Sequence, residues 1–183
     1  KGALNLVLGA GSAMGDILVE HPLVKAGSFT GSNSVGKRVH TIGGARGIKV
    51  TCEMGGKNPA VVMDDADLGL ALGGVMKGAF GATGQRCTAT SRLILHEKIA
   101  DAFLKMLIGE VKKLKVGDGM DGTVTMGPAV DESQMNTDLE YIEIGKKEGA
   151  KLVLGGRRLT DGALAHGFFV EPTIFDHVKS SMR

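Results

Sequence analysis

The chain has 183 residues, of which 43% are hydrophobic, and its formal net charge is +2. This length suits one sizeable domain or parts of two, and so small a charge gives no electrostatic reason to expect binding to nucleic acid or to a membrane surface. No uninterrupted apolar run reaches about 18 residues, so the sequence predicts no membrane-spanning helix.

The first part of the chain alternates short apolar segments with longer amphipathic ones. The expected elements are a strand over residues 4–8, a helix over 12–21, a strand over 25–31, a helix over 32–44 and a strand over 47–54. Pro22 stops the first helix, and Ser32 is the expected N-cap of the second. Strands that alternate with helices in this way predict parallel pairing through right-handed crossovers.

The same rhythm restarts after Gly55 and Gly56, which mark the predicted joint between two α/β units. The expected elements of the second unit are a strand over 60–65, a helix over 67–83, a strand over 91–97, helices over 98–114 and 131–149, and strands over 150–156 and 168–175. The helix capped by Asp67 is apolar almost all round and is therefore expected to be buried. Both sheets look unfinished at the chain ends, which indicates a fragment of a larger enzyme.

The cysteines and histidines argue against a disulfide framework and against a metal site. Cys52 and Cys87 are too few for a disulfide scaffold, and free thiols indicate a cytoplasmic protein. No secretory signal is visible, although the chain begins at Lys1 and not at Met. The five histidines show no ligand spacing and no C-x-x-C occurs, so no metal site is expected.

Residues 31–37 have the spacing G-x-x-x-x-G-K of a nucleotide triphosphatase phosphate loop. The next residue should be Ser or Thr, whose hydroxyl binds Mg²⁺, but the chain has Arg38. The triphosphate interpretation is therefore poorly supported. A strand, a glycine-containing turn and a helix N-terminus still form an anion site, and an ordinary helix start is the simpler alternative.

Three motifs in order decide between these alternatives. They are F-T-G-S-x-x-V-G from Phe29, C-E-M-G-G-K-N-P from Cys52, and G-Q-R-C ending at Cys87. With this order and spacing the chain resembles the NAD(P)-dependent aldehyde dehydrogenase superfamily over essentially its whole length. The stretches GQRCTATSRLILHE and DLEYIEIGKKEGAKLVLGG look most similar to the 2-oxoglutarate semialdehyde (2,5-dioxopentanoate) dehydrogenases.

The resemblance implies a parallel-sheet, three-layer α/β fold. Residues 1–56 would be the C-terminal part of the dinucleotide-binding domain, and residues 57–183 a catalytic domain that is incomplete at its C-terminus. The substrate would be a small aldehyde, and the full-length enzyme a homodimer or homotetramer. The chain by itself is expected to be inactive.

The resemblance also implies NAD or NADP as cofactor. Gly31 and Ser32 would lie against the pyrophosphate, and Val35 near the adenine. The other expected cofactor contacts are Phe29, Thr30, Met54 and, as a minor contact in a turn that only looks like a Rossmann fingerprint, Gly11.

Cys87 is the implied nucleophile, and it must be a thiolate to attack. The alternative for a cytosolic cysteine is a small buried hydrophobe, which the G-Q-R-C context disfavours. Glu53 is the implied general base, with a solvated strand-end carboxylate as its alternative. Cys52 should point to the opposite face of the strand from Glu53, whereas Cys87 and Glu53 are expected to line one crevice.

The implied reaction passes through a thiohemiacetal and a thioester on Cys87, and Glu53 activates the water that hydrolyses the thioester. The backbone N–H of Cys87 would hold the oxyanion, together with an Asn that would lie upstream of Lys1. The Glu that grips the nicotinamide ribose would lie beyond Arg183. Arg86 could hold a substrate carboxylate, although a surface or supporting role is the alternative.

Several other functions stay open at this point. Succinate semialdehyde and non-phosphorylating glyceraldehyde-3-phosphate dehydrogenases share the same chemistry. An acylating relative would transfer the acyl group to coenzyme A or phosphate, which the presence of Glu53 disfavours. A cysteine hydrolase would need a histidine near Cys87, and a non-catalytic fragment would need no reactive thiol.

Overall fold

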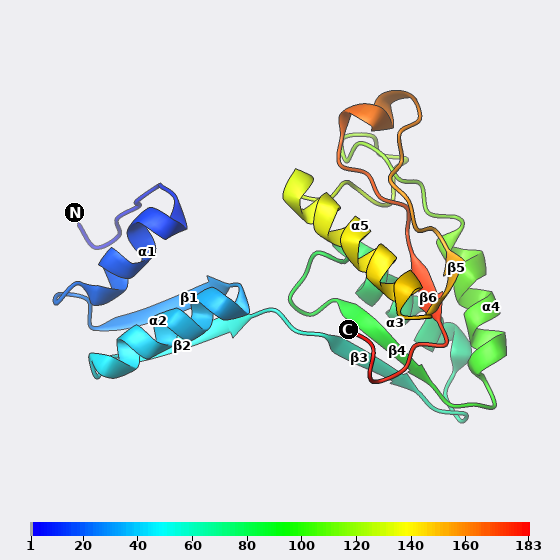
Figure 1. Ribbon diagram of the computed structural model, residues 1–183, viewed down its shortest axis with the longest axis horizontal. Helices are drawn as coiled ribbons and strands as arrows, with labels where there is room; N and C mark the ends of the chain where they lie inside the picture. Colours follow the sequence, from blue (N-terminus) through cyan, green and yellow to red (C-terminus); the bar gives the residue numbers. More distant parts are fainter. Residues whose placement is uncertain (1) are drawn as a thin grey trace. The chain divides into compact units, whose positions relative to one another are not determined.

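The computed structural model describes residues 2–183, and the chain divides into two compact units, with the boundary in the sequence between Gly56 and Lys57. We call residues up to Gly56 unit 1 and residues from Lys57 unit 2. Unit 1 contains α1 (Gly11–Glu20), β1 (Ala26–Gly31), α2 (Asn33–Ala45) and β2 (Lys49–Met54) (Figure 1). Unit 2 contains β3 (Asn58–Val62), α3 (Leu68–Phe80), the 3₁₀ helix η1 (Gly81–Gly84), β4 (Thr90–Leu95), α4 (Ala100–Val111), α5 (Glu132–Lys147), β5 (Lys151–Leu154), η2 (Gly162–His166) and β6 (Ile174–Asp176).

The parallel pairing predicted for the first two sheets is confirmed. β1 pairs with β2 in parallel, in register from Ala26 opposite Lys49 to Gly31 opposite Met54. β3 pairs with β4 in parallel, with a register shift after Asn58. β5 and β6 form an antiparallel pair, which the sequence pattern did not indicate. The α/β fold class is therefore confirmed, with two parallel strand pairs and one antiparallel pair.

The strand predicted over residues 4–8 is wrong. Among the described residues no strand pairs with this segment, and Leu4 is 93% exposed. A strand needs a ladder of backbone hydrogen bonds to a neighbour, so an apolar pattern alone does not make one. The Gly-rich segment after it therefore forms no strand–turn–helix unit, and Gly11 is simply the first residue of α1.

The last predicted strand is much shorter than expected. β6 covers only Ile174–Asp176, whereas the sequence predicts a strand over 168–175. Pro172 lacks an N–H to donate to a ladder, which confines such a residue to strand ends and edges. Upstream of it the backbone makes only an isolated bridge between Val170 and Arg158.

The core of unit 2 lies between two helices and strands from both of its sheets. Its buried members are Val62, Val75, Phe103, Leu107, Val111 and Ile174. Phe103 on α4 is completely buried, and a side chain of this size contributes about 1.5–3 kcal/mol when it leaves water. α3 and α4 thus cover one face of the strands.

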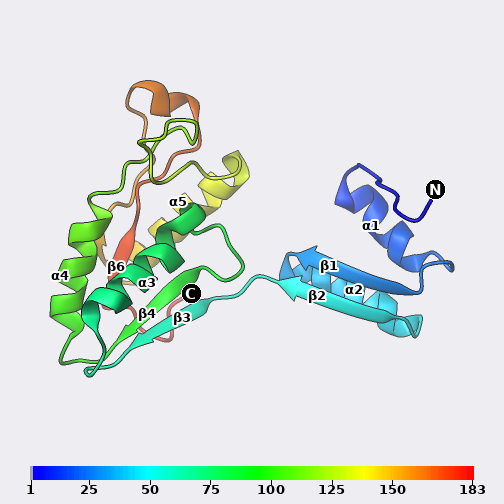
Figure 2. The same ribbon diagram turned by 180° about the vertical axis from the view of Figure 1, so that it is seen from behind.

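α5 covers the other face. Ile174 of β6 packs into the core described above, and successive side chains of a strand point to opposite faces. The next side chain, Phe175, meets α5 at Gly145, where an added Cβ would lie 3.0 Å from the ring. Figures 1 and 2 show α5 and α3 on opposite sides of the strands of unit 2.

The prediction that α3 is buried all round is wrong. Val75 is its only residue classed as buried, and Leu70 is 79% exposed. One side of the helix faces the core, while the other side carries Leu70 and glycines such as Gly73 and Gly74, which offer little apolar area to bury. The predicted cap is present, because the Asp67 carboxylate accepts a hydrogen bond from the Leu70 N–H at 3.0 Å.

A half-buried carboxyl on α5 provides a test of this packing. Burial raises the pKa of Asp138 above its ordinary value, and a 2.8 Å hydrogen bond from the Gln134 amide only partly opposes the rise. A raised folded-state pKa means that the fold favours the protonated carboxyl. The contribution of Asp138 to stability is therefore greatest below the ordinary pKa of 3.8 and is lost as pH rises through the raised value.

Asp138→Asn is accordingly expected to raise the free energy of unfolding at pH 7 and to change it little near pH 3. Urea unfolding at both pH values measures the difference. Asp65→Asn, at an exposed turn, serves as the control. An equal effect of Asp138→Asn at both pH values would contradict the assignment.

None of the helices within residues 2–183 combines the length and apolar character needed to span a bilayer. Across the same residues no group of three or more His, Cys, Asp or Glu side chains is arranged to hold a metal ion.

Candidate active site

The predicted cofactor residues of unit 1 lie mainly around the connection from β1 to α2. β1 ends at Gly31, and Ser32 caps α2: its hydroxyl accepts the Val35 N–H at 3.4 Å. No acidic residue occupies the first turn of α2. The positive dipole and free N–H groups of a helix N-terminus favour an anion, and no carboxylate within this turn competes with one.

Two glycines set how closely α2 lies on the strands. Gly36 and Gly43 are buried on the same face of α2. A Cβ at Gly36 would overlap the Met54 sulfur, and one at Gly43 would overlap the Val50 side chain. This contact, which we call the glycine seam, holds the N-terminus of α2 against the carboxyl ends of both strands.

Each predicted cofactor residue of unit 1 can now be placed. The Phe29 ring lies on the α2 side, within 3.3 Å of where a Gly36 Cβ would be. Met54 packs on the same side and is 36% exposed. Thr30 lies on the opposite, uncovered face of the strand pair, and Val35 is 46% exposed in the first turn of α2.

Glu53 also lies on the uncovered face of β1 and β2. It is exposed and stands next to Thr30 in the parallel register. Cys52 points the other way, as strand alternation predicts, and its thiol donates to the Gly36 carbonyl at 3.5 Å. The structure therefore places the carboxylate at the carboxyl end of a parallel strand, the usual position of ligand sites in open α/β sheets.

Removing the α2 cap should weaken unit 1. Ser32→Ala is expected to lower the free energy of unfolding by about 1 kcal/mol, because the Val35 N–H loses its side-chain acceptor. Ser32→Asp keeps an acceptor there and should remain close to the unsubstituted protein. Thermal unfolding of both variants checks this, and equal destabilisation by the two substitutions would count against a capping role.

Cys87 is exposed and belongs to a tight turn in unit 2. The turn spans residues 86–89 and is closed by a 3.0 Å hydrogen bond from the Ala89 N–H to the Arg86 carbonyl. We call it the Cys87 turn. The thiol lies after the C-terminal end of α3 and before β4, so it is not at the start of a helix.

The backbone before the Cys87 turn is strained. Ala82 and Thr83 in η1 have φ values of 51° and 58°, in the left-handed region that residues with a Cβ rarely enter. Such conformations cost about 1–3 kcal/mol each, persist only where the surroundings impose them, and cluster at functional sites. Here the Thr83 hydroxyl is held by the Gly127 carbonyl at 3.2 Å.

The model of the aldehyde dehydrogenase family matches residues 1–183. The chain belongs to the aldehyde dehydrogenase family. The sequence-based resemblance is thereby confirmed for the whole chain.

Individual relatives agree with this assignment. The chain is 48% identical over 181 residues to alpha-ketoglutaric semialdehyde dehydrogenase of Bacillus subtilis, covering 99% of this chain and 37% of the relative. It is 47% identical over 185 residues to 2,5-dioxopentanoate dehydrogenase of Saccharolobus solfataricus, covering 100% of this chain and 38% of that one. The chain thus spans little more than a third of the length of these curated relatives.

A solved structure shares the fold. Betaine aldehyde dehydrogenase of Staphylococcus aureus, crystallised in complex with NAD⁺, matches with a TM-score of 0.93 at 38% identity, over 97% of this chain and 35% of that chain.

Two side chains of this aldehyde dehydrogenase chain that bind the backbone around Cys87 were not among the predicted site residues. Asn58 donates to the carbonyls of Cys87 and Ala89, and Gln85 binds the backbone at Pro128 and Val130. Both belong to the motifs that carry the resemblance, but motif letters do not reveal hydrogen-bond partners. The predicted substrate contact, Arg86, is exposed and forms no ion pair among the described residues.

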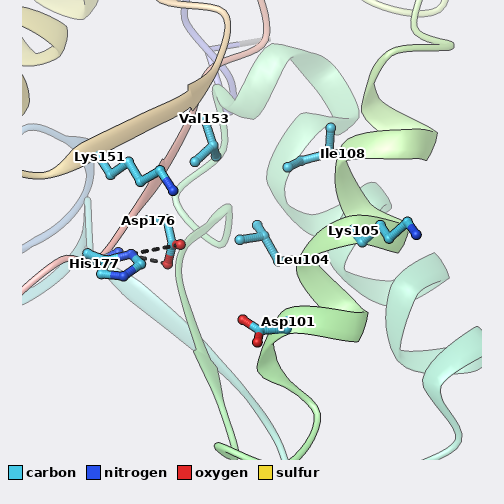
Figure 3. Close-up of a pocket in the computed structure, with 8 residues that line it drawn as sticks. All are labelled: Asp101, Leu104, Lys105, Ile108, Lys151, Val153, Asp176 and His177. Carbon is cyan, nitrogen blue, oxygen red and sulfur yellow. Dashed lines mark hydrogen bonds and ion pairs between the residues drawn. The ribbon is translucent and has the colours of Figure 1, made fainter.

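A surface pocket elsewhere in unit 2 contains none of the predicted site residues. It lies between α4 and the β5–β6 pair, and Figure 3 shows Leu104 and Ile108 of α4 facing Val153 (Figure 3). At its edge the His177 Nδ1 lies 2.8 Å from the Asp176 carboxylate. The rim carries two lysines, Lys105 and Lys151, and two aspartates, Asp101 and Asp176. It therefore favours neither an anionic nor a cationic ligand.

Proposed function

We propose that the protein containing this chain oxidises a small semialdehyde to the carboxylate with NAD⁺ or NADP⁺. The observation that carries the proposal is the exposed Cys87 thiol, presented by a tight turn after strained backbone. Two relatives at 47–48% identity are named for the same compound, because alpha-ketoglutaric semialdehyde is 2,5-dioxopentanoate. 2-Oxoglutarate semialdehyde is therefore the proposed substrate.

Unit 1 fits the phosphate side of a dinucleotide. Gly31 and Ser32 would lie against the pyrophosphate, where the first turn of α2 supplies N–H groups and no acidic side chain. The half-exposed Val35 would present an apolar surface to the adenine, with Phe29, Thr30 and Met54 around the strand ends and Gly11 as a minor contact. Ser32→Asp, which keeps the cap, should weaken cofactor binding by charge repulsion.

Cys87 would carry the covalent chemistry. Its thiolate forms a C–S bond to the aldehyde carbon, and the carbonyl electron pair moves to oxygen. The Cys87 backbone N–H donates to that oxyanion. The nicotinamide cofactor, when bound, supplies the acceptor for the hydride whose loss leaves a thioester on Cys87.

Glu53 would act in the second half of the reaction. Its carboxylate takes a proton from water as the water attacks the thioester carbon. The C–S bond then breaks, the acid leaves and the Cys87 thiolate returns. The exposed position of Glu53 on an uncovered sheet face is compatible with access to water.

The remaining assignments follow the same proposal. Unit 1 would be the C-terminal part of the cofactor domain and unit 2 most of the catalytic domain. Arg86 would meet the substrate carboxylate, and the full-length protein would be a homodimer or homotetramer. Two free cysteines favour a cytoplasmic location.

A substrate panel on the full-length protein tests the proposal. Semialdehydes of 2-oxoglutarate and succinate, glyceraldehyde 3-phosphate and betaine aldehyde would each be supplied with NAD⁺ and with NADP⁺. The highest kcat/KM is expected with 2-oxoglutarate semialdehyde, with the free acid as product. Oxidation only in the presence of coenzyme A or phosphate would indicate an acylating enzyme, and absence of hydride transfer with any aldehyde would overturn the proposal.

A further inference from the structure

One side chain holds two carbonyl groups of the Cys87 turn. The Asn58 amide nitrogen donates to the Cys87 carbonyl at 2.7 Å and to the Ala89 carbonyl at 3.1 Å. Both acceptors are backbone carbonyls, which cannot donate, so the side chain must present its NH₂ group and uses both N–H bonds. Asn58 therefore binds the residue that bears the thiol and the residue that closes its turn.

The backbone that carries Asn58 is itself held in place. Asn58 is the first residue of β3 and pairs with Thr90, and the register shifts immediately after it, so that Pro59 pairs with Arg92. The Arg92 guanidinium donates twice to the Lys57 carbonyl, at 3.0 and 2.7 Å. Such irregularities re-aim individual side chains and occur next to active sites; this one directs Asn58 at the Cys87 turn.

The other end of the turn is anchored by Gln85. Its amide nitrogen donates to the Pro128 carbonyl at 3.1 Å, and its amide oxygen accepts the Val130 N–H at 2.8 Å. This pair of bonds fixes the residue directly before the turn. With one end anchored by Gln85, the hydrogen bonds from Asn58 determine how the remainder of the turn is oriented.

These contacts bear on the direction of the Cys87 N–H. In a planar trans peptide, the carbonyl of one residue and the N–H of the next point in opposite directions. The Arg86 carbonyl is directed at the Ala89 N–H, 3.0 Å away, so the Cys87 N–H is aimed away from the turn's own hydrogen bond. Asn58 binds the carbonyls of Cys87 and Ala89, the same two residues whose N–H groups this geometry directs, and so restrains the backbone of the turn at both residues.

We propose that Asn58 is a positioning residue for Cys87, acting by donating both amide hydrogens to the Cys87 turn. It aims the thiol and the backbone N–H, and it does not itself contact the substrate. This proposal rests on the proposed role of Cys87 as nucleophile. Its consequence is that the donor capacity at position 58, and not merely the volume of the side chain, sets the reactivity of Cys87.

The test compares three substitutions that change the donors at position 58, one of them at nearly unchanged side-chain size. Asn58→Asp is nearly isosteric but offers only acceptors to two carbonyls, Asn58→Ala offers nothing, and Asn58→Ser retains one donor. The expected order of kcat is Asn, then Ser, then Ala, with Asp lowest. The Ala variant should lose on the order of 10- to 100-fold, as a misplaced catalytic group does, with little change in KM.

A second readout follows the thiol itself. Iodoacetamide labelling of the full-length protein across pH 5–10, resolved by peptide mass spectrometry, gives separate rates for Cys87 and for Cys52 as internal reference. The Asp variant should move the Cys87 profile to higher pH, because a new carboxylate beside the turn disfavours the thiolate, while the Cys52 profile stays unchanged. Asn136→Ala, at an exposed position of α5, is the control.

Each outcome decides. The positioning role is overturned if the pH profile of Cys87 labelling and kcat both stay unchanged in the Asp and Ala variants. It is also overturned if kcat falls only in proportion to a fall in the thermal unfolding midpoint. If Asn58→Ala or Asn58→Asp prevents folding, Asn58→Ser provides the test. A reduced kcat at an unchanged thermal unfolding midpoint supports the proposal, and an unchanged kcat overturns it. If Cys87→Ala retains full oxidation, the proposed function fails instead.

Discussion

Replacing Cys87 with alanine is expected to abolish aldehyde oxidation by the full-length protein. Loss of a nucleophile removes the covalent intermediate, and comparable losses in covalent catalysts are on the order of 10⁴-fold or more in kcat. Stability should change little because the side chain is exposed and buries almost no apolar surface. Steady-state NADH formation and thermal unfolding, measured on the same preparation, separate the two effects.

Cys52→Ala is the matched control. Its thiol faces α2 and donates to the Gly36 carbonyl, so its loss should affect unit 1 locally and leave oxidation in place. Substantial residual turnover in Cys87→Ala, together with loss of turnover in Cys52→Ala, would show that the wrong thiol has been assigned.

Replacing Glu53 with glutamine should separate the two halves of the reaction. Attack by Cys87 and hydride transfer do not require the base, whereas hydrolysis of the thioester does. The expected result is a burst of NADH close to one equivalent, followed by steady turnover reduced by about 10²- to 10⁴-fold, the usual contribution of a general base. Rapid-mixing absorbance at 340 nm records both phases.

A thioester that accumulates after the burst can be confirmed by mass spectrometry of the acylated protein. Glu20→Gln, at an exposed end of α1 in the same unit, is the control and should show uninterrupted turnover. Normal steady turnover in Glu53→Gln would remove Glu53 as the base. It would leave the role of Cys87 intact, since the two variants report different steps.

The elements best predicted from the sequence were those with a cap and a clear period. Ser32 and Asp67 begin α2 and α3 as expected, and Gly149, with φ of 89°, follows α5 where the helix was expected to end. The strand expected over residues 4–8 failed because a strand depends on a partner, which an apolar pattern cannot supply. The burial of α3 was overestimated because an apolar pattern all round the helix includes glycines, which contribute almost no apolar surface.

The candidate site was predictable only in part for a related reason. Exposure of Cys87 and the opposite orientation of Cys52 and Glu53 follow from local features, namely a motif and strand alternation. The hydrogen bonds of Asn58 join residues that lie 29 and 31 positions apart, and those of Gln85 reach 43 and 45 positions. Contacts of this kind depend on the irregular register of β3 and β4 and on loop geometry. That Glu53 and Cys87 share one crevice stays a prediction, which the burst experiment tests.

The glycine seam of α2 has a consequence for natural and laboratory variation. In a saturation library of this helix, functional clones should retain glycine at 36 and 43, one heptad apart, while outward positions such as Lys37, Thr41 and Gly44 accept nearly any residue. Deep sequencing before and after selection would then show glycine retained at these two positions, apolar residues at the buried Val39 between them, and free variation only on the outward face.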